Sequence, residues 1–570
     1  MREKVHTPVS AFRLVVISSL LLSSALVLVW RAFDLQVLRK DFLQGQGDAR
    51  ALRTEPVAAH RGMITDRNGE PLAISTPVDS VWVQPKLFMT AQAQWPALAR
   101  QLGLDLNDMK QLVSQRQERE FVFLKRQISP VLAEQVMALE ISGVSLLREY
   151  RRYYPLGEVA AHVLGFTNVD DQGQEGMELA YEHWLRGTPG QQRVIKDRLG
   201  RVIQHVELLQ KPQPGKDLSL SIDRRLQYLT YRELKKAVFE HKARAGSAVI
   251  LDVHSGEILA MVNQPSYNPN TRRALKAENF RNRAITDVFE PGSTIKPFTI
   301  AAGLDSGKFS AESKLNTSPG YLRVGTNVVR DVRNYGQIDV ATVLQKSSNV
   351  GASMIAMAIP VKALQDLHQA LGFGETSASG FPGESTGLVN MSPRWRPIEQ
   401  ATMAFGYGLS VTSLQLARAY SVLGNGGYLK PVHFVRQQQE VEGQRVIQSQ
   451  TVKAIGKMLE AVVSREGTAL KASVQGYRVA GKTGTVKKLV NGQYSEDRYL
   501  SLFVGMAPAS APRFVMVVNI DEPKGDVYYG GEVAAPVFSR VMSGALRLFD
   551  IAPDMTPPER WHIAASEARL

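Results

Sequence analysis

Cysteine is absent from this sequence of 570 residues. Disulfide bonds, thiolate metal sites and a cysteine nucleophile are therefore excluded. Long runs of basic residues are absent too, although the net charge is +14. Neither the spacing of a zinc finger nor the aromatic motif of an RNA-binding domain is present, so the excess charge favours a generally basic surface over a dedicated nucleic-acid site.

Long apolar runs are equally scarce, with one exception near the N-terminus. Residues 14–30 read LVVISSLLLSSALVLVW and carry no charge. This length is near the lower limit for a membrane-spanning helix, and Trp30 suits the membrane interface. A cleavable signal peptide is the alternative, but no small-x-small cleavage site follows the run. We therefore expect an uncleaved single-pass anchor, with the short tail of residues 1–13 on one side and the bulk of the chain translocated to the other.

The clearest domain boundary is the segment 210–216, QKPQPGK. It is polar and rich in proline and glycine, and no apolar periodicity crosses it. Before it, Asn68-Gly69 predicts a hairpin, and helical patterns near 91–117 and 129–141 alternate with short strand patterns. These patterns predict a mixed, elongated α+β module.

Beyond the boundary, strand patterns stand at both ends of the region and helical patterns lie between them. We expect a helix over 223–241, capped by Asp223. The expected strands cover 218–222, 248–253, 258–262, 499–506 and 514–520. This order predicts one sheet flanked by helices. The proline-rich tail from about 550 is expected to be irregular.

The tetrapeptide Ser293-Thr294-Ile295-Lys296 follows a Pro-Gly turn and precedes an apolar run. This context predicts a helix with the serine in its first turn. Residues i and i+3 share a helix face, so the Lys296 amine can reach the Ser293 hydroxyl and make it a useful nucleophile. No other lysine of the chain has a serine three residues before it. Taken alone, however, the pattern is more typical of a helix N-cap.

Two further motifs follow the serine in the sequence. They are Ser347-Ser348-Asn349, after a helical stretch, and Lys482-Thr483-Gly484, which occurs once in the chain. Ser293 would attack a carbonyl, and Lys296 would take its proton if burial and a second cation keep the amine neutral. Ser347 can pass a proton to a leaving amine.

The remaining motif residues suit substrate binding. Asn349 can hold Lys296 and a substrate amide, while Lys482 and Thr483 supply a positive charge and a hydroxyl for a carboxylate. Gly484 allows a substrate backbone to lie close against the strand. The backbone N–H groups of Ser293 and Thr485 would form an oxyanion hole. The ordered trio makes a structural accident a poor explanation.

The trio resembles that of serine β-lactamases and penicillin-binding proteins, with Ser348 in place of the usual aspartate. Four segments outside the site resemble the pedestal motifs of class B penicillin-binding proteins. They are Arg61-Gly62 with Asp66-Arg67-Asn68-Gly69, the segment 152–165, Glu175-Gly176-Met177-Glu178 and Gly187-Thr188-Pro189-Gly190. The segment 281–293 is most similar to the division-specific, FtsI-type branch.

The resemblance implies an α+β multidomain fold: a cytoplasmic tail, an anchor, a pedestal and a transpeptidase domain with a central, mainly antiparallel sheet flanked by helices. The corresponding ranges are 1–13, 14–30, 31–215 and 216–548, followed by a tail at 549–570. It places the protein in the inner membrane with its bulk in the periplasm. The implied activity is a D,D-transpeptidase that crosslinks stem peptides through a Ser293 acyl-enzyme during septal wall synthesis.

The resemblance also implies the site and the partners. The implied catalytic residues are Ser293, Lys296, Ser347, Asn349 and Lys482, and the implied substrate-binding residues are Thr483, Gly484, Thr485 and Tyr407. Tyr407 is equally consistent with core packing. No cofactor or metal is implied. The implied partners are peptidoglycan stem peptides, β-lactam antibiotics, a membrane-embedded lipid-linked glycan polymerase, other division proteins and the lipid bilayer, with no nucleic acid.

Several alternatives compete with this interpretation. A β-lactamase shares the trio, but hydrolysis of a soluble drug needs neither an anchor nor a pedestal. A bifunctional polymerase would need a glycosyltransferase domain where residues 31–215 match pedestal motifs instead. A penicillin sensor, a catalytically inactive division scaffold and a transpeptidase of the elongation branch complete the set.

Overall fold

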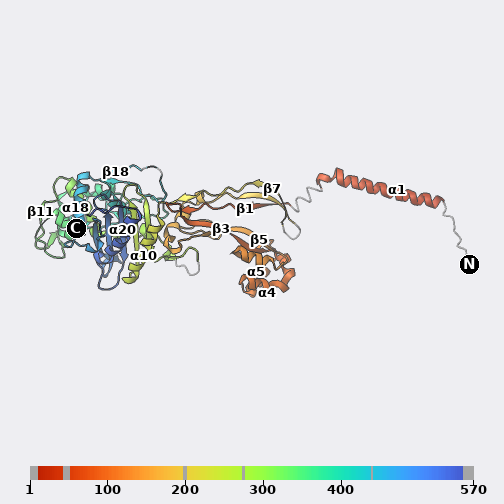
Figure 1. The fold of residues 1–570 in the computed structure, drawn as a ribbon, viewed down its shortest axis with the longest axis horizontal. Coiled ribbons are helices and arrows are strands. Elements are labelled where there is room, and N and C mark those ends of the chain that lie inside the picture. The colour runs from red at the N-terminus through yellow and green to blue at the C-terminus, as the bar shows by residue number, and fades with distance from the viewer. Residues whose placement is uncertain are drawn as a thin grey trace, which may run out of the picture. The chain divides into compact units, whose positions relative to one another are not determined.

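Two compact units share the chain by alternation in the computed structural model, which describes residues 11–42, 52–196, 202–271, 277–437, 439 and 441–555. The first unit comprises Met1–His60, Pro77–Tyr150 and Gly187–Pro214. The second comprises Arg61–Thr76, Arg151–Arg186 and Gly215–Leu570. The colour bar of Figure 1 locates these segments in the ribbon.

The first unit begins with the apolar segment predicted as an anchor. Helix α1 (Ala11–Phe33) continues into a π-helical turn, Asp34–Leu38. This 28-residue stretch has a mean hydropathy of 2.3 and is long and apolar enough to cross a membrane, and none of its most apolar window is buried. It indicates a single-pass membrane protein (Figure 1). Asp34 pairs with Arg31 and Arg39, at 2.7 and 3.0 Å, where the apolar stretch ends.

The rest of the first unit holds a ribbon of strands and a small helical cluster. Strands β1 (Leu52–Val57), β6 (Gly190–Lys196) and β7 (Val202–Gln210) form an antiparallel sheet. Strands β3 (Pro71–Val83), β4 (Val122–Ile128) and β5 (Val144–Tyr153) accompany helices α3 (Pro85–Phe88), α4 (Trp95–Leu102), α5 (Leu106–Ser114) and α6 (Pro130–Met137). The helix predicted over 91–117 is thus two helices. Gly103, at φ 62°, ends α4, and Asp105 caps α5.

The second unit contains the segments of the first three pedestal motifs. Strand β2 (Ile64–Thr65) pairs with the start of β3 across the predicted Asn68-Gly69 turn, which is confirmed, with Gly69 at φ 84°. Strand β8 (Leu218–Ser219) runs parallel to β2 and is shorter than the predicted 218–222. Helices α7 (Ala161–Leu164), α8 (Gly176–Ala180) and α9 (Glu182–Leu185) follow.

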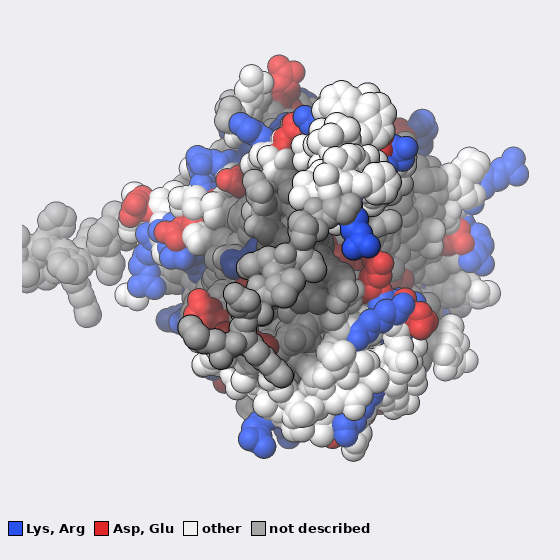
Figure 2. Space-filling view, turned by 90° about the vertical axis from the view of Figure 1, so that its right-hand side faces the viewer, with Lys and Arg blue, Asp and Glu red and all other residues white. Residues whose placement is uncertain are grey.

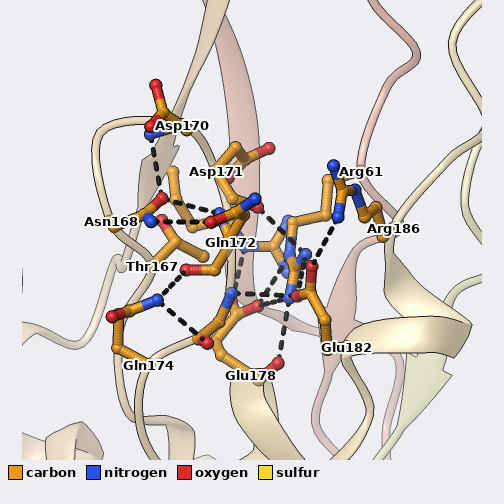
Figure 3. A network of polar contacts seen from close by, with 12 residues as sticks. Arg61, Thr167, Asn168, Asp170, Asp171, Gln172, Gln174, Glu178, Glu182 and Arg186 are labelled. Atoms are coloured by element: carbon orange, nitrogen blue, oxygen red, sulfur yellow. Dashed lines mark hydrogen bonds and ion pairs between the residues drawn. The ribbon is translucent and has the colours of Figure 1, made fainter.

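A buried ion-pair network connects these motif segments (Figure 3). The Arg61 guanidinium donates to Glu178 at 2.8 Å, to Glu182 at 2.6 Å and to the carbonyl oxygen of Asp171 at 3.1 Å. Arg152 donates to the other carboxylate oxygen of Glu178 at 2.6 Å. The Arg61 and Glu178 side chains are 2% and 0% exposed. Removing one partner of such a pair costs about 3–5 kcal/mol, so the network holds the segments near residues 61, 152 and 178 in one arrangement.

The core of the second unit is a five-stranded antiparallel sheet, as predicted. Its order is β10 (Ile258–Gln264), β9 (Ala245–Asp252), β21 (Phe514–Asp521), β20 (Gln493–Ala507) and β19 (Ala480–Val490). Every residue of β9, β10 and β21 is buried, so both faces of the sheet are covered. Strand β19 lies at one edge, and its Lys482 is opposite Val504 of β20.

Helices cover this sheet. Helix α10 (Arg224–Glu240) begins after Asp223, whose carboxylate accepts from the N–H groups of Arg225 and Leu226, so the predicted helix and its cap are confirmed. It packs with α20 (Ala535–Leu548), whereas α17 (Ser413–Gly424) packs on β9 and β21. The site helices are α12 (Lys296–Asp305), α13 (Val340–Lys346), α14 (Asn349–Ala358), α16 (Pro397–Met403) and α18 (Ser449–Val462). The smaller elements are α11 (Arg283–Thr286), α15 (Val361–Ala370), α19 (Gly530–Val533), β11 (Lys314–Asn316), β12 (Tyr321–Val324), β13 (Asn327–Arg330), β14 (Gln337–Asp339), β15 (Leu388–Val389), β16 (Leu409–Ser410), β17 (Tyr428–Leu429) and β18 (Gln444–Arg445).

Surface charge is mixed in sign on the face that Figure 2 shows. Lysines and arginines are interspersed there with aspartates and glutamates instead of gathering in one patch. A nucleic-acid site needs a concentrated basic surface, which this face does not present.

Candidate active site

Ser293 lies in a tight turn immediately before helix α12. The turn is a 3₁₀ segment, Gly292–Ile295, and the α-helix starts only at Lys296, so the prediction that the serine belongs to the first turn of the α-helix was wrong. Pro297 favours a helix start at this point. Side chains at i and i+3 eclipse in a 3₁₀ turn, so Ser293 and Lys296 still share one side.

Gly292 allows the serine turn to approach strand β19. Its φ is 55°, and a Cβ atom added to it would lie 2.4 Å from Cγ2 of Val486. Its N–H donates to the carbonyl oxygen of Gly406 at 3.2 Å. The Tyr420 hydroxyl donates to the carbonyl oxygen of Thr294 at 2.6 Å. The nucleophile position is therefore fixed by backbone contacts on both sides.

Lys296 is fully buried beside the Ser-Ser-Asn segment. Its amine donates to the carbonyl oxygen and the Oγ of Ser347, at 2.5 and 3.1 Å, and to Oδ1 of Asn349 at 2.8 Å. Burial lowers the pKa of Lys296 well below its ordinary value, nearby Lys482 lowers it further, and Asp331 opposes this shift. The amine is thereby favoured in its neutral form, which can accept a proton.

The expected hydrogen bond between Ser293 and Lys296 is not formed. Within the described part of the chain the Ser293 hydroxyl has no hydrogen-bond partner, and the Lys296 amine is directed to Ser347 and Asn349. Such bonds between nucleophile and base are often loose in a free enzyme and tighten with substrate. The pairing of Ser293 with Lys296 stays a prediction.

Lys482 joins the same cluster from strand β19. Its buried amine donates to Ser347 Oγ at 3.0 Å and to the carbonyl oxygen of Thr483 at 3.2 Å. Burial lowers the pKa of Lys482 to about 7. The Ser347 hydroxyl thus lies between two lysine amines, which is the arrangement that a proton relay requires.

Ser347 adopts a backbone conformation that is uncommon for a residue with a side chain. It ends helix α13 with φ 60° and ψ 39°, in the left-handed region. Such conformations cost about 1–3 kcal/mol and cluster at functional sites. The conformation directs both the carbonyl oxygen and the hydroxyl of Ser347 to Lys296. Ser348 then caps helix α14 by accepting from the N–H of Gly351.

The sequence analysis missed Asp331, which holds this segment in place. Its carboxylate accepts from Ser348 Oγ at 2.6 Å, from the N–H of Val350 at 3.1 Å and from the N–H of Asn349. A carboxylate at a helix N-terminus satisfies free N–H groups and is stabilised by the helix dipole. Only the serine at position 348, where the related motif has an aspartate, could have signalled that an acid must come from elsewhere.

Substitution of Asp331 by asparagine should shift the acid limb of the pH profile for Ser293 acylation to lower pH. The negative charge of Asp331 raises the pKa of Lys296, so its removal makes the amine neutral at lower pH. Stopped-flow acylation by a chromogenic β-lactam between pH 5 and 9 measures this shift. Asp331→Ala is the matched variant and loses the cap as well, which costs about 1 kcal/mol of stability. An unchanged acid limb in Asp331→Asn would restrict Asp331 to a purely structural role.

The predicted substrate-binding residues of β19 lie beside the serine turn. Thr483 Oγ1 is 3.0 Å from Thr468 Oγ1, and Thr485 Oγ1 accepts from the N–H of Gly530 at 3.0 Å. A Cβ atom on Gly484 would lie 3.1 Å from Cγ2 of Thr294, so the glycine allows the serine turn to pack against the strand. Its predicted contact with a substrate backbone stays a prediction.

Tyr407 combines packing with proximity to the site. It follows α16 on the loop that contains Gly406, and its ring packs edge-on against Phe405 and Tyr494, with centroids 5.6 and 5.4 Å away. Burial raises the pKa of Tyr407. The even choice between packing and substrate contact thus stays open. Within the described ranges, no three His, Asp or Glu side chains gather where they could hold a metal ion.

A buried serine–lysine–serine–lysine cluster at the edge of an antiparallel sheet defines a serine acyl-transfer enzyme. The model of the penicillin-binding protein transpeptidase domain matches residues 246–543, and that of the penicillin-binding protein dimerisation domain matches residues 56–220. The chain belongs to the class B penicillin-binding proteins, and within them to the FtsI type.

Individual relatives agree with this assignment. The peptidoglycan D,D-transpeptidase FtsI of Escherichia coli K12 is 44% identical over 559 residues, which cover 97% of this chain and 94% of the relative. A probable peptidoglycan D,D-transpeptidase PenA of Neisseria gonorrhoeae is 42% identical over 530 residues, covering 92% of this chain and 91% of the relative. The transpeptidase domain of Burkholderia pseudomallei penicillin-binding protein 3, at 41% identity, superposes with a TM-score of 0.55 over 59% of this chain and 98% of that chain.

Proposed function

We propose that this protein crosslinks peptidoglycan stem peptides as a serine D,D-transpeptidase in septal wall synthesis and that β-lactams acylate the same serine. The observation that carries the proposed mechanism is the position of Ser347 Oγ, 3.1 Å from the Lys296 amine and 3.0 Å from the Lys482 amine. This path connects a base beside the nucleophile with an acid beside the leaving group.

Acylation and deacylation use the cluster in opposite directions. Ser293 Oγ attacks the carbonyl between the two terminal D-alanines while Lys296 takes its proton. The proton passes through Ser347 to the leaving amine, the C–N bond breaks and free D-alanine departs. An amine of a second stem peptide then attacks the ester; its proton returns along the path to Ser293 Oγ as the C–O bond breaks. Lys482 and Thr483 bind the terminal carboxylate, Asn349 and Thr485 hold the peptide, and the N–H groups of Ser293 and Thr485 stabilise the oxyanion.

The setting of this reaction belongs to the proposal. Residues 1–13 would lie in the cytoplasm, residues 14–30 in the inner membrane and the rest in the periplasm, with a pedestal over 31–215, a transpeptidase domain over 216–548 and a tail at 549–570. The pedestal region carries no glycosyltransferase motif, so the glycan strands would come from a membrane-embedded, lipid-linked polymerase that acts with other division proteins. The family assignment and the anchor support this setting.

Depletion of the protein in its host should produce filamentous cells, because septal crosslinking would stop while elongation continues. Phase-contrast microscopy of a depletion strain measures cell length. Re-expression of the wild-type chain should restore division and Ser293→Ala should not. Round cells would assign the protein to the elongation branch, and division restored by Ser293→Ala would favour the inactive scaffold.

A further inference from the structure

A groove of about 340 Å³ opens beside the serine turn, and the reaction steps above leave it unused. Its walls are mostly apolar and include Leu388, Leu409, Val486 and Leu500. Glu290, three residues before the nucleophile, lines the groove as well. Val486 is also the residue against which Gly292 packs, so the groove adjoins the turn that carries Ser293.

Glu290 is a half-buried carboxylate without a cationic partner among the described residues. It accepts from the N–H of Gly408 at 2.9 Å and from the Tyr494 hydroxyl at 3.1 Å. Lys487, the nearest lysine of the groove wall, is engaged with Glu496 instead. Burial raises the pKa of Glu290. Two neutral donors orient this carboxylate, and a cation from outside would compensate its charge.

The position of the groove along β19 separates it from the end that binds a carboxylate. Lys482 and Val486 are both on this strand, about 13 Å apart at about 3.3 Å per residue. The negatively charged terminus of the first peptide suits the Lys482 end, whereas Glu290 would repel it. The end near Val486 suits a positively charged ligand with an apolar stem.

We infer that the groove at Glu290 binds the acceptor of the crosslinking reaction: a primary ammonium group on the aliphatic side chain of a second stem peptide. This inference rests on the proposed transpeptidase function and adds a place for its second substrate. The aliphatic stem lies along the apolar wall, and Glu290 receives the ammonium. The amine, once it has lost one proton to solvent, attacks the Ser293 ester from this side.

The test measures how the acyl-enzyme divides between water and an amine. The full-length protein in detergent is acylated with an acyl-D-alanyl thioester, and Nα-acetyl-D-lysine is titrated as the acceptor while both products are quantified. In Glu290→Gln, the amine concentration that diverts half of the acyl-enzyme should rise about tenfold, because a charge-assisted hydrogen bond is lost. Leu388→Ser, at the exposed rim, should raise it about threefold. Glu496→Gln removes an exposed carboxylate nearby and should leave it unchanged.

Acylation by a fluorescent penicillin is measured in parallel and separates the two hypotheses. A wild-type protein that forms no penicillin adduct contradicts the proposed function itself. A wild-type protein that forms the adduct but does not use Nα-acetyl-D-lysine contradicts the acceptor groove alone. The same holds if Glu290→Gln divides its acyl-enzyme as the wild type does, or if it alters only the KM of the thioester donor. Should Glu290→Gln fail to fold in a thermal melt, the Leu388→Ser titration decides.

Discussion

Replacement of Ser293 by alanine should lower the rate of stem-peptide crosslinking by at least about 10,000-fold, since the acyl-enzyme loses the oxygen on which it forms. The assay incubates the protein with pentapeptide substrate and quantifies released D-alanine and crosslinked dimer by mass spectrometry. The fold should be retained, because the Ser293 hydroxyl makes no hydrogen bond within the described ranges and the turn is held by Gly292 and Thr294 backbone contacts.

Ser306→Ala is the matched control for this substitution. Ser306 follows α12, and its hydroxyl donates to the carbonyl oxygen of Gly303 at 2.7 Å, away from the lysine cluster. Its removal should leave crosslinking within about twofold of the wild type. Crosslinking that survives Ser293→Ala would transfer the nucleophile to another residue.

Replacement of Lys296 by methionine should slow acylation of Ser293 by about 1,000-fold, the scale of a lost general base. Methionine fills a similar volume, so the buried site keeps its packing. The Ser347 carbonyl and Asn349 Oδ1 lose a donor, so a modest fall in the melting temperature is expected as well. Labelling by a fluorescent penicillin over time measures the rate.

Lys308→Met provides the comparison for a lysine outside the site. The Lys308 amine donates to the carbonyl oxygen of Ala358 at 2.6 Å and is exposed. Acylation should keep its wild-type rate in this variant. Wild-type labelling of folded Lys296→Met would remove Lys296 as the base and leave Lys482 as the candidate.

The catalytic cluster could be predicted from the sequence because each of its parts is a short motif with its own local structure. Ser347-Ser348-Asn349 lies between two helices, and Lys482 begins the exposed side of a strand in a sheet whose strands are continuous apolar runs. The helix start was misplaced by three residues, since Gly292 and Pro297 together favour a 3₁₀ turn before the α-helix. Boundaries of this kind depend on tertiary contacts, here the approach of Gly292 to Val486.

Other features could not be predicted from local patterns. Asp331 belongs to no motif, and its function arises only when the loop after β13 folds over the start of α14. The helix expected over 91–117 is interrupted because Gly103 takes a left-handed conformation. The two compact units alternate along the chain, and no composition change marks each crossing between them. Glu290 likewise gains its setting from Gly408 and Tyr494, which are distant in sequence.

The location of the covalent adduct tests the central claim most directly. Wild-type protein is incubated with a penicillin, digested with trypsin and analysed by tandem mass spectrometry. The added mass of one intact penicillin should appear on the peptide that covers residues 284–308, with fragment ions that place it on Ser293. An adduct on a different residue, or none at saturating penicillin, would contradict the assignment of Ser293 as the nucleophile.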